Sequence, residues 1–320
     1  MLSIITFSLV ACEKIIEFKG KETQPLLVVN SIIQPDSTLL VSVTNSVFFL
    51  SNNLIEPIEN ADVLLFVNNN FVEKMEYVPV DHDGYSYFTY NSHYKLKAGD
   101  KVRYEVSAPN FDKVWAEVTI PVPVTIIALD TLVEQNIYET DTYNYTPEKW
   151  HCKMKFADNA NEKNYYRLSV VKKIAGYNSY TGEYEVRQME FGFNSNDMLF
   201  NNDPANSGII YEYSNEYNIF SDDMINGKEY TLAFDIEPEN GGLGQISEND
   251  STFFYFRLEN LSYEYYMYLR TLSSQNDDMG FLAEPTQIFT NINGGIGILG
   301  AFSVSDKKVE WKAPKSQYGI

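Results

Sequence analysis

The chain has 320 residues, which corresponds to about two domains. Because 44% of the residues are hydrophobic and 21% are charged, the chain can form packed cores and does not have the composition of a disordered protein. The formal net charge of −20 argues against binding to nucleic acid or to an anionic membrane face through a basic surface. With 3 His and 2 Cys, the sequence also excludes a disulfide framework and a Cys/His zinc cluster.

The N-terminal segment joins an apolar run to a cysteine. Residues 1–11 (MLSIITFSLVA) carry no charge and are shorter than the roughly 20 residues that a membrane-spanning helix needs, so they fit the apolar part of a secretory signal. Residues 9–12 (LVAC) resemble a bacterial lipobox, which predicts a signal and lipobox over 1–12 with Cys12 as the acylated residue. A short buried segment with an incidental cysteine is the alternative. The polar, Lys- and Glu-rich residues 13–24 are then a tether to the folded part.

From residue 25 onward the pattern is strand, turn, strand. Aromatic residues make up 15% of the chain, with 24 Tyr and 20 Phe, and such residues favour half-buried strands. Turns are predicted at Asp83-Gly84 and at Gly99, and alternation is clear over 102–106. The expected strands are 26–33, 38–44, 62–67, 71–78, 85–90, 101–107 and 113–120. This spacing predicts an immunoglobulin-like antiparallel sandwich over residues 25–122.

Pro121 and Pro123 predict the boundary to a second domain over 123–320, because proline cannot donate to a strand ladder and stiffens the chain. This domain is expected to be larger, β-rich, and to contain one or two short helices. Its expected strands are 149–156, 165–172, 183–193, 229–236, 252–258 and 301–305.

One helix is predicted directly after Ser262, whose hydroxyl can cap it. Tyr265, Tyr268, Leu269 and Leu272 then share one face at helical spacing, and residues 273–278 end the helix.

The span 195–255 is strongly acidic, with 12 Asp and Glu residues against one basic residue, Lys228. Two interpretations stay open. The span consists of solvated loops, as most charge runs do, or it meets a partner or a cation.

The sequence predicts no catalytic residues. Nucleophilic catalysis requires a nucleophile beside an oriented base, and His82, His93 and His151 lie in no recognised motif. Cys152 is expected to be a half-buried structural thiol, because its neighbour His151 would point to the opposite face of a strand.

Metal and cofactor sites are likewise not expected. The sequence Asp81-His82-Asp83-Gly84 lacks the terminal Glu of a calcium loop, and Gly294-Gly295-Ile296-Gly297 is not followed by the Lys-Ser/Thr step of a phosphate loop. Acidic pairs do occur, and they keep a carboxylate-based hydrolase open as an alternative. These pairs are Asp222-Asp223, Asp277-Asp278 and Glu237 with Glu239.

Several segments together resemble one family. They are residues 9–12, 27–33, 58–63, 164–168, 262–275 and 284–302. The most specific is NINGGIGILGAF over 291–302, and the similarity covers nearly the whole chain. This order is similar to the Bacteroidota lipoproteins called domain of unknown function 4249.

The resemblance implies an outer-membrane lipoprotein, often encoded beside a TonB-dependent transporter, with an immunoglobulin-like N-terminal domain and a second β-rich domain. It brings no catalytic residues, and Cys12 alone carries over as a functional position. We therefore expect a non-enzymatic, lipid-anchored accessory of a TonB-dependent outer-membrane transporter, on the cell surface, that captures cargo or covers the barrel. A surface adhesion or structural lipoprotein without a transporter partner is the main alternative. The carboxylate-based hydrolase is the third.

Overall fold

The computed structural model describes ten ranges of the chain. These ranges are 24–48, 53–82, 85–135, 138–139, 144–145, 148–178, 181–201, 215–238, 251–273 and 287–312.

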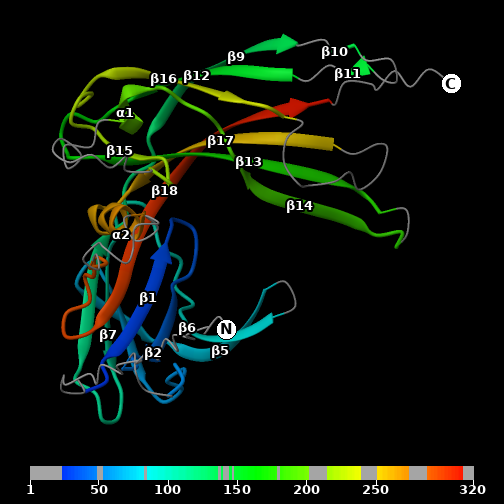
Figure 1. Ribbon diagram of the computed structural model, residues 1–320. Coiled ribbons are helices and arrows are strands. Elements are labelled where there is room, and N and C mark those ends of the chain that lie inside the picture. Colours follow the sequence, from blue (N-terminus) through cyan, green and yellow to red (C-terminus); the bar gives the residue numbers. More distant parts are fainter. Residues whose placement is uncertain are drawn as a thin grey trace, which may run out of the picture.

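The first module is a sandwich of two β-sheets (Figure 1). One sheet has the strand order β1-β2-β6-β5, with the bounds Leu27–Ile33, Leu40–Asn45, Tyr85–Asn91 and Glu76–His82. The facing sheet has the order β4-β3-β7-β8, with the bounds Asn70–Lys74, Asp62–Val67, Lys101–Ser107 and Val114–Thr119. Alternation creates the core: in β7, Val102, Tyr104 and Val106 are buried between the sheets, while Arg103 and Glu105 face outward.

The second module is also built from two facing sheets. One contains β14 (Tyr184–Phe191), β13 (Tyr165–Tyr177), β17 (Ser251–Leu261) and part of β18 (Ile296–Trp311). The other has the order β16-β12-β9, with the bounds Glu229–Ile236, Glu148–Ala157 and Thr125–Gln135. Their shared core is rich in aromatic side chains, among them Trp150, Phe156, Tyr166, Phe254 and Phe256.

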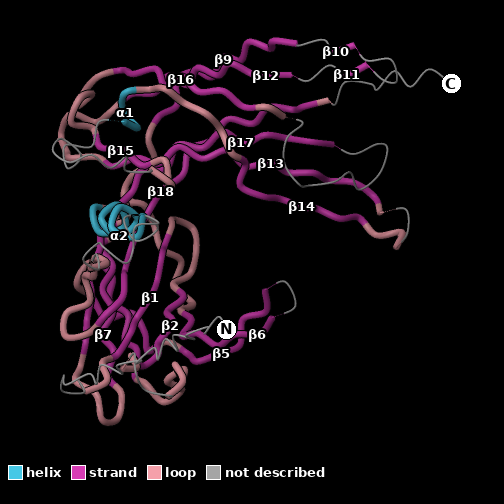
Figure 2. Tube along the Cα trace, in the orientation of Figure 1, coloured by secondary structure: helices cyan, strands magenta, loops and turns pink. Residues whose placement is uncertain are grey.

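Short elements complete this module (Figure 2). β15 pairs with β13, and β10 and β11 pair with each other. Their bounds are Ile219–Ser221, Tyr138–Glu139 and Asn144–Tyr145, and the helices are α1 (Met198–Asn201) and α2 (Tyr263–Ser273).

Strand β18 belongs to both modules (Figure 1). Its first part, residues 296–301, pairs in parallel with β1, and its second part, residues 302–311, pairs antiparallel with β17. Leu299 and Ala301 are buried in the first core, and Val309 packs against the second. One strand therefore joins the two modules into a single sheet with the order β14-β13-β17-β18-β1-β2-β6-β5.

The prediction of a mainly β, sandwich-like protein is confirmed, as are two short helices. The hydroxyl of Ser262 accepts a hydrogen bond from the amide of Tyr265 at 3.2 Å and caps α2 as expected. The buried face of α2 carries Tyr266, Leu269 and Ser273, so it is centred slightly away from the predicted face. The domain limit at residue 122 stays a prediction. The structure shows in addition that residues 292–301, from the far end of the chain, pack with the first module.

Several strand predictions need correction, and among them the predicted strand 165–172 continues to Tyr177 as β13. The last strand is not limited to 301–305, because β18 starts inside the glycine-rich stretch and runs to Trp311. The expected strand 71–78 is two strands, since the chain passes at the buried Met75 from the sheet of β3 to the sheet of β6. Strand β9, residues 125–135, and the short strands β10, β11 and β15 have no counterpart in the expected set.

Candidate functional site

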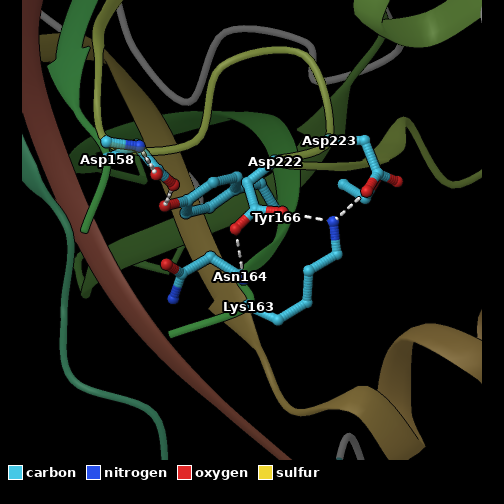
Figure 3. Close-up of polar contacts among 8 residues, drawn as sticks. Asp158, Lys163, Asn164, Tyr166, Asp222 and Asp223 are labelled. Atoms are coloured by element: carbon cyan, nitrogen blue, oxygen red, sulfur yellow. Dashed lines mark hydrogen bonds and ion pairs between the residues drawn. The ribbon is translucent and has the colours of Figure 1, made fainter. Parts of the chain in front are cut away.

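A network of polar side chains lies in the second module, next to the junction between the modules (Figure 3). Its centre is Asp222, which is fully buried. One carboxylate oxygen of Asp222 accepts a hydrogen bond from Lys163, and the other accepts one from the backbone amide of Asn164 at 2.7 Å. Lys163 also donates to Asp223. Burial alone would lower the pKa of Lys163, but the two carboxylates outweigh it and raise that pKa.

A second carboxylate, Asp158, extends this network. Its oxygens accept hydrogen bonds from the hydroxyl of Tyr166 at 2.5 Å and from the amide of Gly227 at 2.6 Å. Burial, followed by the contact with Asp158, raises the pKa of Tyr166, so the phenol keeps its proton. The network thus ties the loop between β12 and β13 to the turn that follows β15.

A small cavity of about 140 Å³ lies beside these residues and borders the linker 122–125. The side-chain amide of Asn260 donates to the carbonyl of Val122 at 3.0 Å, and the hydroxyl of Ser305 donates to that of Val124 at 2.5 Å. The polar side chains of β17 and β18 therefore hold the linker. Their role is to fix one module against the other.

A larger groove, of about 370 Å³, lies on the outer face of β12 and β16 and is closed on one side by residues 194–197. Its volume lies in the range of about 300–1,000 Å³ that is usual for small-molecule sites. His151 lies at this groove, with Nδ1 2.8 Å from Asp235 Oδ1 and Nε2 2.9 Å from Glu134 Oε2. Lys149 forms an ion pair with the second oxygen of Asp235 at 2.9 Å.

These contacts set the charge of the groove. The hydrogen bond to Glu134, followed by that to Asp235, raises the pKa of His151. Burial opposes ionisation of Asp235, but the hydrogen bonds from Lys149 and His151 prevail and lower its pKa. The groove therefore presents the carboxylate of Asp235, which is held by Lys149 and His151, together with the amide groups of Asn194 and Asn196. It can bind a small polar molecule by hydrogen bonds.

Cys12, the predicted lipidation site, lies outside the described residues. Cys152 is more deeply buried than the half-buried position that was expected. Burial raises the pKa of its thiol to about 12, so the thiol is protonated and unreactive at neutral pH. His93 is exposed, with Nδ1 3.3 Å from Glu73, and the side chain of His82 is not described.

The glycine-rich segment has a packing role. Gly297 has φ +120°, and a Cβ on it would lie 2.1 Å from the carbonyl oxygen of Val29. A Cβ on Gly300 would meet Ile32 and Tyr265 at 2.8 and 2.9 Å. These glycines therefore allow β18 to approach β1 and α2 closely.

The structure describes some of the predicted acidic pairs and not others. Asp222 and Asp223 share Lys163, as described above, and so belong to the polar network. Asp277, Asp278 and Glu239 lie outside the described residues, as do residues 202–214 and 239–250 of the acidic span. Asp83 and Gly84 also lie outside, although β5 and β6 pair on either side of them.

Sequence reasoning missed two cations of β13, the partly buried Arg167 and the buried Lys172. Arg167 contacts both carboxylate oxygens of Glu190 at 2.6 and 2.8 Å and one oxygen of Glu259 at 3.4 Å. Lys172 is buried, donates to the carbonyl of Pro238 at 2.8 Å and lies 5.0 Å from the ring centre of Trp311. The sequence could have indicated Lys172, because this lysine stands among apolar residues on the same face of β13. A cation that is buried in this way needs a partner.

Two searches for recognisable sites concern the described ranges only. Within them, no three His, Cys, Asp or Glu side chains come together as a metal site would require. In the same part of the chain, no helix combines the length and the apolar character needed to cross a bilayer.

Comparison with known proteins gives one family. No curated protein matches the sequence. The profile described as Domain of unknown function (DUF4249) matches residues 13–308, which include every described strand of both modules up to most of β18. The chain belongs to the DUF4249 family.

Proposed function

We propose that this chain is a lipid-anchored lipoprotein of the outer membrane that acts, without catalysis, as an accessory of a TonB-dependent transporter. In this proposal Cys12 carries the acyl chains, residues 13–24 are the tether, and the first module holds the second module away from the membrane. The second module captures cargo or covers the barrel.

The direction of β1 is the observation that carries the proposal. The strand begins at Leu27, beside Asn110, Asp112 and Gly294 at the end of the first module that faces away from the second. Its other end, at Ile32, lies against Gly300 and α2 at the junction. A tether that enters at Leu27 therefore reaches the molecule at the pole opposite the second module (Figure 1).

This arrangement suits a tethered binding protein. The residues between Cys12 and Leu27 span at most about 50 Å when extended. Acyl chains contribute about 0.8 kcal/mol per buried CH₂, so several chains on one cysteine give stable anchoring. The groove at His151 lies in the second module, where it would be presented away from the membrane, and its size supports the capture of a small cargo.

Affinity purification of the tagged full-length chain from detergent-solubilised outer membrane tests the proposal. We expect mass spectrometry of the intact mature protein to find an acylated Cys12 at its N-terminus, and a β-barrel transporter to co-purify with it. An unmodified Cys12 with the apolar leader still attached would overturn the anchor.

The Cys12→Ala variant is the matched control, because it precedes the fold. The variant should be lost from the membrane fraction. Its circular dichroism spectrum and Tm should match those of the wild-type protein. A lipidated protein that recovers no transporter would refute the accessory role and favour a structural surface lipoprotein.

A further inference from the structure

The outer edge of β9 is a sheet edge that the described fold leaves unpaired. Within the described chain, β9 pairs with β12 on one side and with no strand on the other (Figure 1). About half of the backbone N–H and C=O groups of such an 11-residue edge strand point away from its neighbour. A free edge of this length can template the addition of another strand.

The side chains along this edge are unusually apolar for an exposed strand. Residues 131–135 are exposed on both faces of the sheet. Leu132 is 71% exposed, and Val133, on the opposite face, is 43% exposed. Ile127, nearer the module, is 41% exposed. Proteins normally protect such edges with lysine, proline, bulges or a covering segment.

Several other described edges carry such protection, while β4 and the part of β18 beyond Ala301 also lack a strand on one side within the described chain. Asn293 forms a single bridge to Trp115 at the edge of β8, and Asn194 forms a single bridge to Asp235 at the edge of β16. β5 contains Pro79, which has no N–H to donate. β14 is open but carries Arg187 in an ion pair with Glu185.

Charge distinguishes β9 from β14 and indicates the occupant. Asp130 and Glu134 are the ionisable residues of β9, which has no Lys or Arg, and one oxygen of Glu134 already contacts His151 at 2.9 Å. Asp130 forms no ion pair among the described residues. We propose that the free edge of β9 is a docking surface for an extended segment of a partner protein, which adds as a fourth strand and carries basic side chains opposite Asp130 and Glu134.

A second copy of this chain fits the edge less well. Antiparallel pairing of two β9 strands would bring their acidic side chains close together, and each copy carries a formal net charge of −20. The inference deepens the proposed function, because it names the surface that would meet a partner, and it rests on that function for the partner's presence in the outer membrane.

Hydrogen exchange of the mature full-length protein tests the edge directly. The probes are a synthetic octapeptide of alternating Lys and Val and its counterpart of alternating Glu and Val. We expect the basic peptide to slow amide exchange within residues 127–135 by about tenfold, with no such effect from the acidic peptide. Leu132→Lys should abolish this protection, whereas Val186→Lys on the edge of β14 should preserve it. Unchanged Tm values establish that both variants are folded.

Three results would overturn the assignment. They are no protection of β9 by the basic peptide, equal protection by both peptides, and protection without peptide that grows with protein concentration, which identifies a second copy as the occupant. Purification of the variants from the outer membrane separates the two proposals. If Leu132→Lys recovers as much transporter as wild type, the edge assignment fails and the accessory role stands. If wild type recovers none, the accessory role fails, and the peptide experiment still decides the edge.

Discussion

Replacing Gly297 with alanine tests whether the close contact between β18 and β1 holds the modules together. Gly297 has φ +120°, a conformation that costs a residue with a side chain about 1–3 kcal/mol. The added Cβ would also lie 2.1 Å from the carbonyl oxygen of Val29, a backbone atom that cannot rotate away. The two strands would have to separate by about 1 Å to relieve this overlap.

That separation weakens the parallel pairing of residues 28–33 with 296–301. Strain and lost pairing together predict that Gly297→Ala lowers the free energy of unfolding by about 3–5 kcal/mol. Gly99→Ala is the first control, because Gly99 also has a positive φ, +85°, but open space around its Cβ position. It should cost about 1 kcal/mol. Gly192→Ala, with open space and no positive φ, should change the stability by less than about 0.5 kcal/mol.

Urea unfolding followed by tryptophan fluorescence measures all three variants. Trp115 reports on the first module, and Trp150 and Trp311 report on the second. Because β18 contributes to both cores, Gly297→Ala should shift the signals of both modules. A loss equal to that of Gly99→Ala would refute the steric argument, and a shift confined to Trp115 would refute the coupling.

The polar contacts lead to three further predictions. Asp222→Ala should lower the free energy of unfolding by about 2–3 kcal/mol, because the buried amide of Asn164 loses its partner, whereas the exposed Asp223→Ala should cost less than about 1 kcal/mol. Urea titrations measure both, and equal losses would contradict the prediction. The raised folded-state pKa of His151 means that its stabilising contribution is fully present below the unfolded pKa of about 6.5 and is lost as the pH rises through the folded value. Thermal melts of wild type and His151→Ala across this range should converge at high pH, and a gap that widens with pH would contradict the sign. The thiol of Cys152 should react with an aromatic disulfide reagent in denaturant and not in the native protein, since burial raises its pKa to about 12; equal rates in both would contradict this.

The local sequence pattern was sufficient to predict an element and its limits where one face of that element is buried and the other is solvated. β7 and β16 alternate in this way, and their predicted limits agree with the structure. The cap at Ser262 was also predictable, because a hydroxyl directly before an apolar helical pattern has few other roles. Such features depend on neighbours within a few positions along the chain.

The missed features depend on partners far apart in sequence. The full length of β18 was hidden because its glycines are typical of a loop until β1, more than 260 residues earlier, is placed beside them. β9 lacks the period-two contrast between buried and exposed residues in its outer half. Sequence alone identified Asp222-Asp223 as a pair but could not supply Lys163, which is 59 residues away.

The shared strand gives the proposed function a mechanical basis. If the connection between the modules were the linker 122–125 alone, force on the second module would rotate it about a single covalent strand. β18 instead continues through the junction as paired sheet, and Asn260 and Ser305 fix the linker alongside it. A partner that adds to the edge of β9 would therefore be held in a fixed orientation relative to β1, the strand that the proposed tether would enter.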